Sequence, residues 1–442
     1  MNRGEEHRPP ASQGLYRRLT RNLIYLAGGT ATAAIFMMLA AGFNARALSA
    51  QEFGLLALLQ TSALMLRGLI SFGTQQPVIQ LGAAALADHD EARLGQVIGL
   101  CLGLDLVAAV AATILAFLVI FLAGGWIGLR SSDTAWACIF AAGLLFTGYL
   151  TSNGIFRLLN RFDLLSLIQA GSGAAILAVA IWFWYVGADF ETYVWAWAGF
   201  MALSTQVQLW TSLWLIRRSG VAISFRFRRT GPDDTRKVME FCWSTWGNAA
   251  IDAVRVHGDS LLVGLFVGIE AAGVYAVAKQ LTGIVRKATD IYASAAYPEV
   301  AMLAAERDFD GARSLRNWMI VAGAVVGLLG LAATAVVGRP LLGFVFGPVF
   351  TTGYGALVLL IAAAGLQLIS HPLAVFVQVF LSPARLFAIY ASALLLYALA
   401  APFGIFWLGI TGAAFGQLIF TAAVIALSTV ALRRTFTPAP AG

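Results

Sequence analysis

The chain has 442 residues, of which 60% are hydrophobic and 12% are charged, and its net charge is +7 at pH 7. A soluble domain carries about 25% charged residues, so a water-soluble fold could not bury this much apolar surface. The mean hydropathy of +0.80 therefore predicts an integral membrane protein. The apolar runs are continuous and do not alternate with polar residues, which predicts membrane helices rather than barrel strands.

Twelve apolar segments predict an all-α protein with twelve transmembrane helices. The first segment is about 21 residues long, whereas the apolar core of a signal peptide has 7–15, so we expect a retained helix. The fourth is short, and we expect its helix to continue toward Phe156. The predicted spans are Leu23–Phe43, Phe53–Phe72, Leu94–Leu122, Ala135–Leu150, Leu164–Val186, Tyr193–Ile216, Phe241–Gly268, Ala271–Tyr297, Trp318–Val337, Tyr354–Phe380, Leu386–Trp407 and Ile410–Leu432.

Positive charges are distributed unequally between the loops that join these spans. With the N-terminus in the cytoplasm, Lys and Arg gather on the cytoplasmic side, and only Arg46, Arg130 and Arg339 fall on the opposite side. This bias predicts that the N- and C-termini are both cytoplasmic. It also explains the net positive charge, so we expect the basic stretch FRFRRT (residues 225–230) to contact anionic membrane lipids and not nucleic acid.

The two halves of the chain place their spans at the same spacing. When the first half is moved by 219 residues, its six spans overlie those of the second half, Gly54 meets Gly273 and Arg67 meets Arg286. This offset predicts two six-helix halves related by a pseudo-twofold axis along the membrane normal, a recurrent plan of transporters. We expect an N-terminal half at 1–216, a basic cytoplasmic linker at 217–240 and a C-terminal half at 241–442.

Charged side chains in the seventh span are the clearest functional signal, because each costs roughly 2.5–3.5 kcal/mol on insertion scales and normally faces a bundle interior or a hydrated cavity. At helical spacing Asp252, Arg255 and Asp259 form one polar stripe. Two interpretations stay open. Arg255 lines a cationic cavity with the aspartates as partners, or Arg255 and Asp259, four residues apart, pair within one helix.

A second polar stripe lies on the eighth span, where Lys279, Arg286 and Asp290 share a face. Arginine suits phosphate because its planar fork binds two oxygens at once. Arg67 and Arg286 occupy matching positions, so we expect both to line a cavity between the halves. The alternative is that Lys279 and Asp290 lie near the cytoplasmic end of the span and extend to the interface.

Asp105, Asp252, Asp259 and Asp290 are the candidates for charge pairing or for coupling to a proton or sodium gradient. For Asp105 the alternative is a polar contact between helices. On the tenth span, His371 shares a face with Gln367 and Gln378; a lone histidine is more often a packing residue than a ligand.

Sequence motifs of enzymes are missing from the chain. It contains no CxxC, HExxH or GxxxxGK[ST] motif, and Cys101, Cys138 and Cys242 all lie in apolar runs, where cysteine behaves as a small packing residue. We therefore expect no catalytic residue, no metal, no cofactor and no enzymatic activity.

Three stretches carry a resemblance to a known family: LSAQEFGLLAL (Leu48–Leu58), DSLLVGLFVGIEAAGVYAVAKQL (Asp259–Leu281) and FGPVFTTGYGAL (Phe346–Leu357). With the twelve-span plan, the chain resembles the polysaccharide biosynthesis or oligosaccharide flippase family (O-antigen, Wzx-type). This family belongs to the multidrug/oligosaccharidyl-lipid/polysaccharide exporter superfamily, which also holds the multidrug and toxin extrusion (MATE) transporters.

The resemblance implies a MATE-like flippase that moves an undecaprenyl-diphosphate-linked oligosaccharide across the bacterial inner membrane by alternating access. The cargo would be a repeat unit of lipopolysaccharide O-antigen or exopolysaccharide, and the partners a polysaccharide polymerase and glycosyltransferases. The substrate-cavity candidates are Arg67, Arg255, Lys279 and Arg286.

Three alternatives stay open beside the flippase. The first is a multidrug or toxin exporter of the same superfamily, which would need an acidic or aromatic cavity for organic cations. The second is a membrane-embedded glycosyltransferase or polymerase, which the short non-cytoplasmic loops disfavour. The third is an assembly scaffold without transport activity.

Overall fold

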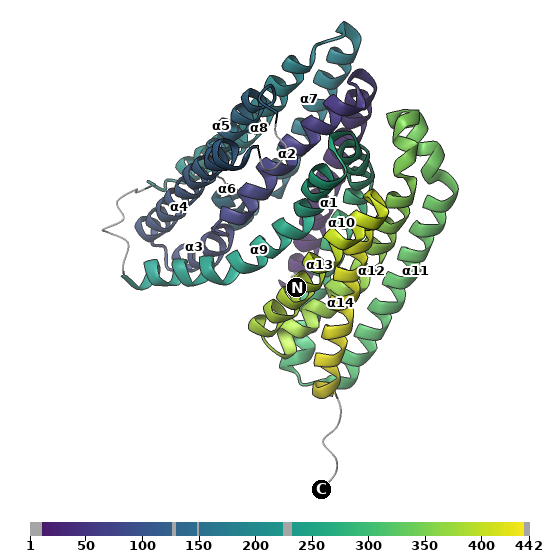
Figure 1. Ribbon diagram of the computed structural model, residues 1–442. Helices are drawn as coiled ribbons and strands as arrows, with labels where there is room; N and C mark the ends of the chain where they lie inside the picture. Colours follow the sequence, from purple (N-terminus) through teal and green to yellow (C-terminus); the bar gives the residue numbers. More distant parts are fainter. Residues whose placement is uncertain (1–10, 126–129, 148–149, 224–231, 437–442) are drawn as a thin grey trace, which may run out of the picture.

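The computed structural model describes residues 11–125, 130–147, 150–223 and 232–436, and within these ranges the regular structure is helical with no strand (Figure 1). The helices are α1 (Ala11–Ala47), α2 (Ala50–Ile70), α3 (Gln75–Ala87), α4 (Glu91–Leu118), α5 (Thr134–Leu144), α6 (Leu150–Leu158), α7 (Phe162–Val186), α8 (Phe190–Arg218), α9 (Pro232–Phe266), α10 (Ile269–Ala305), α11 (Phe309–Leu341), α12 (Tyr354–Phe380), α13 (Pro383–Leu408) and α14 (Ile410–Phe436), with short helical turns η1 (Val119–Ala123), η3 (Leu342–Phe346) and η4 (Pro348–Gly353).

The described residues contain eight helical segments that are long and apolar enough to cross a membrane. They confirm the prediction of an all-helical membrane protein. Helices α8, α9 and α10 cover three further predicted spans but are too polar to meet the same criterion. Their polar faces need no contact with lipid when they face other helices. The count of twelve spans stays a prediction.

One predicted span is divided in the structure, and another is followed by an additional helix. The second span ends at Ile70, and after a short break the chain forms α3, which the sequence did not predict. Gly73 in this break has φ of +63°, and a Cβ there would clash with the Thr245 hydroxyl of α9, so only glycine fits. The fourth span is divided into α5 and α6, which confirms that helix continues past Leu150 to include Phe156.

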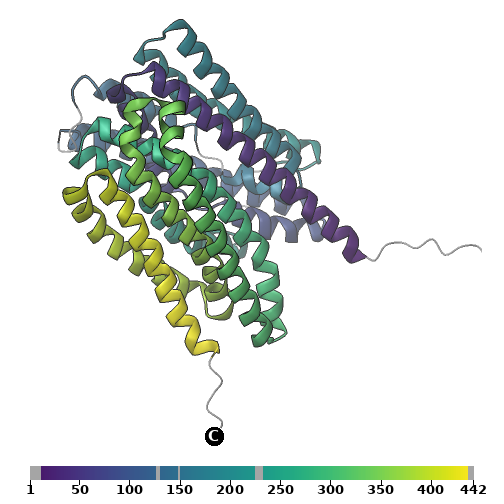
Figure 2. The ribbon, with the colours of Figure 1, turned by 90° about the vertical axis from the view of Figure 1, so that its right-hand side faces the viewer.

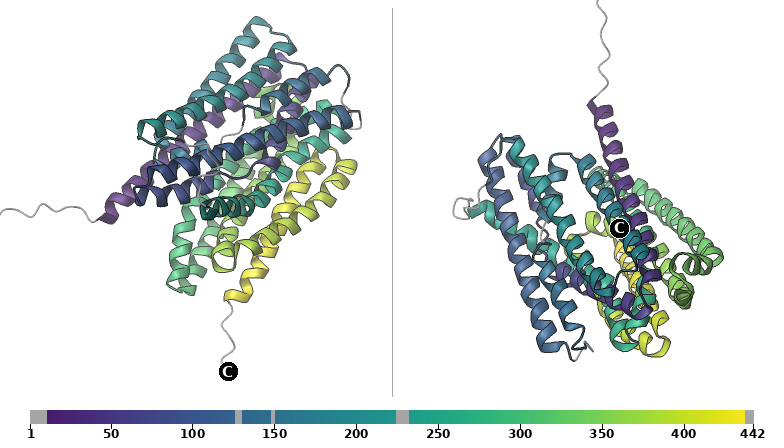
Figure 3. Two further views of the ribbon diagram at one scale, coloured as in Figure 1. Left: turned by 90° about the vertical axis from the view of Figure 1, so that its left-hand side faces the viewer. Right: turned by 90° about the horizontal axis from the view of Figure 1, so that it is seen from above.

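The helices form two groups with α2, α9 and α10 between them. On one side α11, α12, α13 and α14 lie together, with α10 against α12 (Figure 2). On the other side α3 contacts α4 and α6, α5 contacts α8, and α1 runs along α7 (Figure 3). Helix α2 contacts both α9 and α10. The charged stripes of α9 and α10 therefore lie at the centre of the molecule.

The α2–α10 contact brings together the two glycines that the 219-residue offset matches. A Cβ on Gly273 would lie 2.9 Å from the Cα of Gly54, and a Cβ on Gly54 would clash with the carbonyl oxygen of Ile269. Absence of side chains at both positions lets the two backbones approach closely, as small residues do at helix contacts in membranes. A larger residue at either position would push α2 away from α10.

Helix α9 joins the two groups. Val238 and Cys242, near its start, belong to a hydrophobic cluster with Val78 of α3 and Leu94 of α4. Val263, near its end, belongs to the large central cluster. Figure 1 shows α9 crossing from the side of α3 toward α10. A shift of one group against the other must therefore move or bend this helix.

An ion pair fixes the beginning of α9 to the beginning of α4. The Arg93 guanidinium donates from Nε to Oδ2 of Asp234 at 2.8 Å and from Nη2 to Oδ1 at 2.9 Å. This hydrogen bonding holds the pKa of the Asp234 carboxyl below its usual value. A carboxyl group with a depressed folded pKa stabilises the fold fully above its unfolded pKa of about 3.9, and the contribution is lost as the pH falls through the folded value.

Arg93→Gln should therefore lower the thermal stability of the detergent-purified protein at pH 7. The difference from wild type should narrow as the pH falls below about 4, because the unpaired carboxyl is then protonated in both states. Arg161→Gln is the matched control, because Arg161 also donates two hydrogen bonds to a carboxylate, Asp163, but that pair is local and more exposed. Equal losses in both variants would contradict a linking role for Arg93.

Candidate functional site

The polar stripe of α9 faces the interior, and Arg255 lines a cavity there with only one of the two aspartates, Asp252, as its partner. The Arg255 side chain is buried and its Nη2 lies 2.5 Å from Oδ1 of Asp252, one turn earlier. The predicted pair between Arg255 and Asp259 is therefore wrong. Both partners of Arg255 were possible from spacing alone, since i−3 and i+4 neighbours lie on the same helix face.

Asp259 instead lies at the centre of a buried hydrogen-bond network between three helices. Its side chain is 0% exposed. It accepts hydrogen bonds from the Tyr275 hydroxyl at 2.7 Å, from Lys279 Nζ at 2.5 Å and from Gln417 Nε2 of α14 at 3.0 Å. A fully buried carboxylate is stable only when it is paired and hydrogen-bonded in this way.

Lys279 has acceptors for all three of its ammonium protons on α9. Besides Asp259, its Nζ donates to the backbone oxygen of Val256 and, at 3.1 Å, to the Ser260 hydroxyl. An ammonium group has three donors and no acceptor. In this conformation Lys279 therefore holds α10 against α9 and has no donor left for a ligand. The alternative of a lysine that extends to the interface is wrong.

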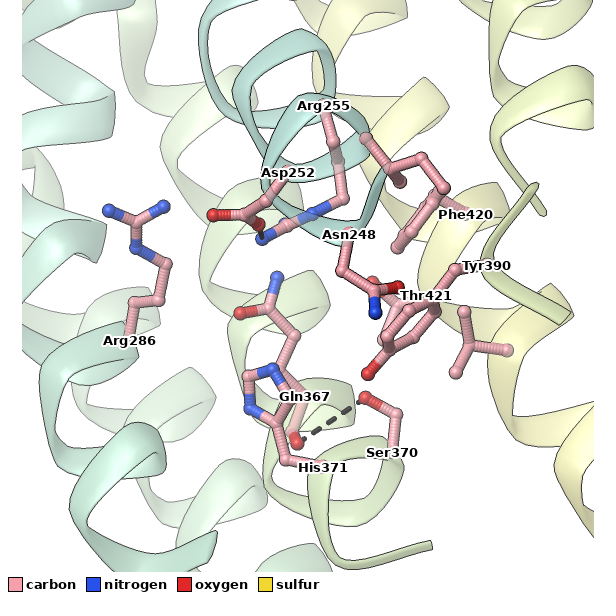
Figure 4. A pocket seen from close by; sticks show the side chains of 12 residues that line it. Asn248, Asp252, Arg255, Arg286, Gln367, Ser370, His371, Tyr390, Phe420 and Thr421 are labelled. Atoms are coloured by element: carbon pink, nitrogen blue, oxygen red, sulfur yellow. Dashed lines mark hydrogen bonds and ion pairs between the residues drawn. The ribbon is translucent and has the colours of Figure 1, made fainter. Parts of the chain in front are cut away.

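A cavity of about 310 Å³ with many polar side chains in its wall opens beside this network (Figure 4). Helices α9, α10, α12, α13 and α14 all contribute to its wall. The lining residues are Asn248, Ile251, Asp252, Arg255, Arg286, Gln367, Ser370, His371, Tyr390, Phe420, Thr421 and Val424. A second cavity of about 110 Å³ shares Arg255, Arg286 and Gln367 with it and borders Asp259 and Lys279.

The two arginines of this cavity differ in their surroundings. Arg255 is held by Asp252 and lies with its Cζ 5.3 Å from the centre of the Phe420 ring. Arg286 lines both cavities and forms no hydrogen bond or ion pair with another side chain that the structure describes. Figure 4 shows its guanidinium projecting from α10 into the space that Asp252 and Arg255 face. No described side chain occupies its donors, which suits the binding of an anionic ligand.

Arg67 lies in a different place from Arg286, although the two occupy matching positions in the sequence. It lines a cavity of about 30 Å³ with Ser71, Asp105, Thr147 and others. This volume is enough for about one or two waters but not for a lipid headgroup. The expectation that the matched arginines share one cavity is wrong for this conformation.

Asp105 connects the two helix breaks of the N-terminal part of the chain. It is 4% exposed and accepts a hydrogen bond from the Thr74 hydroxyl, just before α3, at 2.6 Å. Its second oxygen accepts from the backbone N–H of Thr151, in the first turn of α6, at 3.0 Å. Asp105 thus makes the predicted polar contact between helices; a role in ion coupling stays a proposal.

Asp105→Asn should lower the stability of the protein by about 1–2 kcal/mol, because the amide keeps only one acceptor oxygen for two buried donors. Thermal unfolding of the purified protein in detergent measures this effect, and Asp310→Asn, at a side chain 94% exposed, should change nothing. A stable Asp105→Asn protein that no longer transports would instead support ion coupling at this position.

The structure therefore brings four of the predicted residues, Asp252, Arg255, Arg286 and His371, to one cavity. Lys279 and Asp259 form the adjacent network, and Arg67 and Asp105 lie apart. The side chain of Asp290 is outside the described residues. Sequence reasoning missed several lining residues: Asn248, Ser370, Tyr390, Phe420 and Thr421. Of these, only Asn248 could have been predicted from the sequence, since it lies four residues before Asp252 on the same polar stripe.

Comparisons with known proteins agree with this architecture. Residues 19–304 match the model of a family described as polysaccharide biosynthesis protein. Inner membrane protein YghQ of Escherichia coli (strain K12) is 25% identical over 350 residues, which cover 78% of this chain and 96% of that protein. It is a relative of this chain across most of the helices described above.

Solved structures of MATE transporters share the fold. An inward-facing multidrug resistance MATE family transporter of the MOP superfamily has a TM-score of 0.74 at 14% identity, covering 91% of this chain and 96% of that one. The MATE multidrug transporter DinF-BH has a TM-score of 0.68 at 14% identity, covering 98% of both chains. The Vibrio cholerae MATE transporter VcmN in its bent form has a TM-score of 0.63 at 14% identity, covering 97% of this chain and 99% of that one. At such identities the likeness shows the fold alone.

Proposed function

This chain belongs to the polysaccharide biosynthesis protein family, and from that premise we propose that it is a flippase or exporter for a polyprenyl-diphosphate-linked oligosaccharide. It would move a polysaccharide or lipopolysaccharide repeat unit across the bacterial inner membrane by alternating access, without covalent chemistry. Undecaprenyl diphosphate is the carrier we expect, with glycosyltransferases supplying the substrate and a polymerase using it.

The observation that carries the proposal is the pair of arginines in the cavity of about 310 Å³. Arg286 has no partner among the described side chains, and Arg255 lies on the neighbouring helix with its charge balanced by Asp252. One net positive charge facing the cavity favours a diphosphate, which arginine binds through two parallel hydrogen bonds. Such a site keeps the headgroup away from the hydrocarbon while the lipid tail remains in the bilayer.

A multidrug exporter is the second candidate, favoured by the MATE fold of the structural neighbours. An organic cation would have to enter a cavity in which Arg255 and Arg286 outnumber the single carboxylate of Asp252. Like charges at close range repel each other. The residues of this cavity therefore fit an anion better than a cation.

The direction of transport fits the charge of the proposed substrate. An anion moving outward across a membrane that is negative inside gains about 2.3 kcal/mol per charge per 100 mV. Antiport of a proton or sodium ion through Asp105, Asp252 or Asp259 is a further possibility for coupling. A transport rate in proteoliposomes that responds to potential but not to either ion gradient would exclude it.

Alternating access also needs two bodies that move against each other. We propose that these are residues 1–216 and 241–442, joined by the linker at 217–240, with both termini in the cytoplasm. The contact of Gly54 with Gly273 supports this division, because it joins positions that match in the two halves. Helix α9, which packs on both groups, would bend during the movement.

The test is lipid analysis of a strain that lacks this protein. We expect polyprenyl-diphosphate oligosaccharide to accumulate in its membranes, as seen by mass spectrometry, while surface polysaccharide is lost. The mass of the accumulated glycan would identify the substrate class. Unchanged lipids together with heightened sensitivity to cationic drugs would overturn the proposal and support the exporter.

A further inference from the structure

The cavity of about 310 Å³ has two chemically different ends. Figure 4 shows Arg286 on one side, with Asp252 and Arg255 next to it, and Ser370, Tyr390 and Thr421 toward the other. The second end has no charged lining residue among those described. It presents amide, hydroxyl and imidazole groups, which are the polar groups that bind uncharged ligands.

Three polar atoms of this cavity are buried and have no partner among the described residues. They are Oδ1 of Asn248, Oε1 of Gln367 and Nδ1 of His371. Buried polar atoms in proteins are almost always hydrogen-bonded, so groups such as these call for water or a ligand. A sugar hydroxyl both donates and accepts, so it can pair with an amide oxygen or with an imidazole nitrogen.

Two aromatic side chains form a wall of the cavity beside these groups. The rings of Tyr390 and Phe420 are stacked, with their centres 6.4 Å apart and their planes inclined by 23°. Both line the cavity. The face of an aromatic ring is electron-rich and attracts the C–H bonds that cover the flat side of a sugar. A wall of this kind next to amide groups is suited to a pyranose ring, which has apolar faces and a polar edge.

We infer that the uncharged end of the cavity binds the sugar attached directly to the diphosphate, an inference that rests on the proposed function. Asn248 and Gln367 would bind its hydroxyl groups, and the Tyr390 ring, supported from behind by Phe420, would contact its face. Ligand pockets measure about 300–1,000 Å³, and this cavity of about 310 Å³ is at the lower limit. It therefore accommodates one sugar with its phosphates, and the rest of the oligosaccharide remains outside.

A cation is a poorer occupant of the same oxygen-rich end. The amide and hydroxyl oxygens would suit one, but Arg255 and Arg286 line the same cavity. Asp252, the carboxylate nearest to them, is already held by Arg255 at 2.5 Å. The positive charge of the arginines favours a ligand that is anionic at one end and neutral at the other, which describes a sugar phosphate.

The inference can be tested with the purified full-length protein in nanodiscs. The probes are undecaprenyl diphosphate alone and undecaprenyl diphosphate carrying glucose, galactose or N-acetylglucosamine. We expect wild type to bind at least one sugar lipid about tenfold more tightly than the bare lipid, as two added hydrogen bonds would give. Gln367→Met and Asn248→Leu should remove this preference but retain binding of the bare lipid.

Gln378→Met is the matched control, since Gln378 lies on the same helix α12 but not in the lining of this cavity. It should keep the full preference for sugar. Equal affinity of wild type for all four lipids, or equal loss of bare and sugar lipids in Gln367→Met, would overturn the sugar site. Failure of the proposed function is a separate outcome, in which wild type binds none of the four lipids.

Discussion

Replacing Lys279 with methionine should largely prevent accumulation of folded protein. Methionine preserves the length of the side chain but leaves the Asp259 carboxylate, which is 0% exposed, without its cationic partner. Removing one partner of a buried ion pair typically costs about 3–5 kcal/mol, because the remaining charge cannot reach water. Tyr275 and Gln417 still donate to Asp259, but neither carries a charge. Fluorescence-detected gel filtration of solubilised membranes measures the loss of the monodisperse peak.

The double variant Lys279→Met with Asp259→Asn should recover most of this loss, because neither remaining side chain is charged. Arg313→Met provides the comparison, since it breaks a pair with Asp310 whose side chains are 38% and 94% exposed, and it should behave as wild type. A Lys279→Met protein as stable as wild type would show that Asp259 is neutral or reaches water, and that the network does not hold α9 and α10 together.

The stripes of charge on α9 and α10 were predictable, but their pairing was not. Helical periodicity places Asp252, Arg255 and Asp259 on one face, and membrane energetics require that face to be interior. The choice of partner depends on how α10 is rotated relative to α9, and the turn at Val267 and Gly268 sets that rotation. Gly268 has φ of +121°, a conformation that sequence spacing does not reveal.

In the fold, too, the features that depend on local sequence were predictable, and those that depend on distant contacts were not. Hydropathy predicted the apolar helices because insertion depends on the sum over about 20 residues. The break between α2 and α3 was not predictable in this way, since it depends on the contact of Gly73 with Thr245, distant in the chain, and on the hydrogen bond from Thr74 to Asp105. Tyr390 and Phe420 were missed for a similar reason: an aromatic residue in an apolar run resembles a packing residue until its neighbours are known.

Arg286→Gln should weaken binding of undecaprenyl diphosphate by about tenfold to a hundredfold, which corresponds to a lost hydrogen bond to a charged group. Surface polysaccharide should fall accordingly, while thermal stability stays unchanged because Arg286 has no ion pair to lose within the described part of the structure. Arg286→Lys should recover only part of the affinity, since an ammonium keeps the charge but not the planar fork. Affinity is measured by thermophoresis of the nanodisc protein at fixed salt.

Arg67→Gln is the most informative comparison, because Arg67 matches Arg286 in the sequence but lines a cavity of only about 30 Å³. A headgroup cannot enter that space, so headgroup affinity should be retained. If both glutamine variants weaken binding equally, the headgroup must reach both arginines in another conformation, and the substrate site spans the two halves as their matching positions indicate. If neither variant changes affinity or export, the cationic cavity is not the substrate site, and the multidrug exporter becomes the better explanation of the fold.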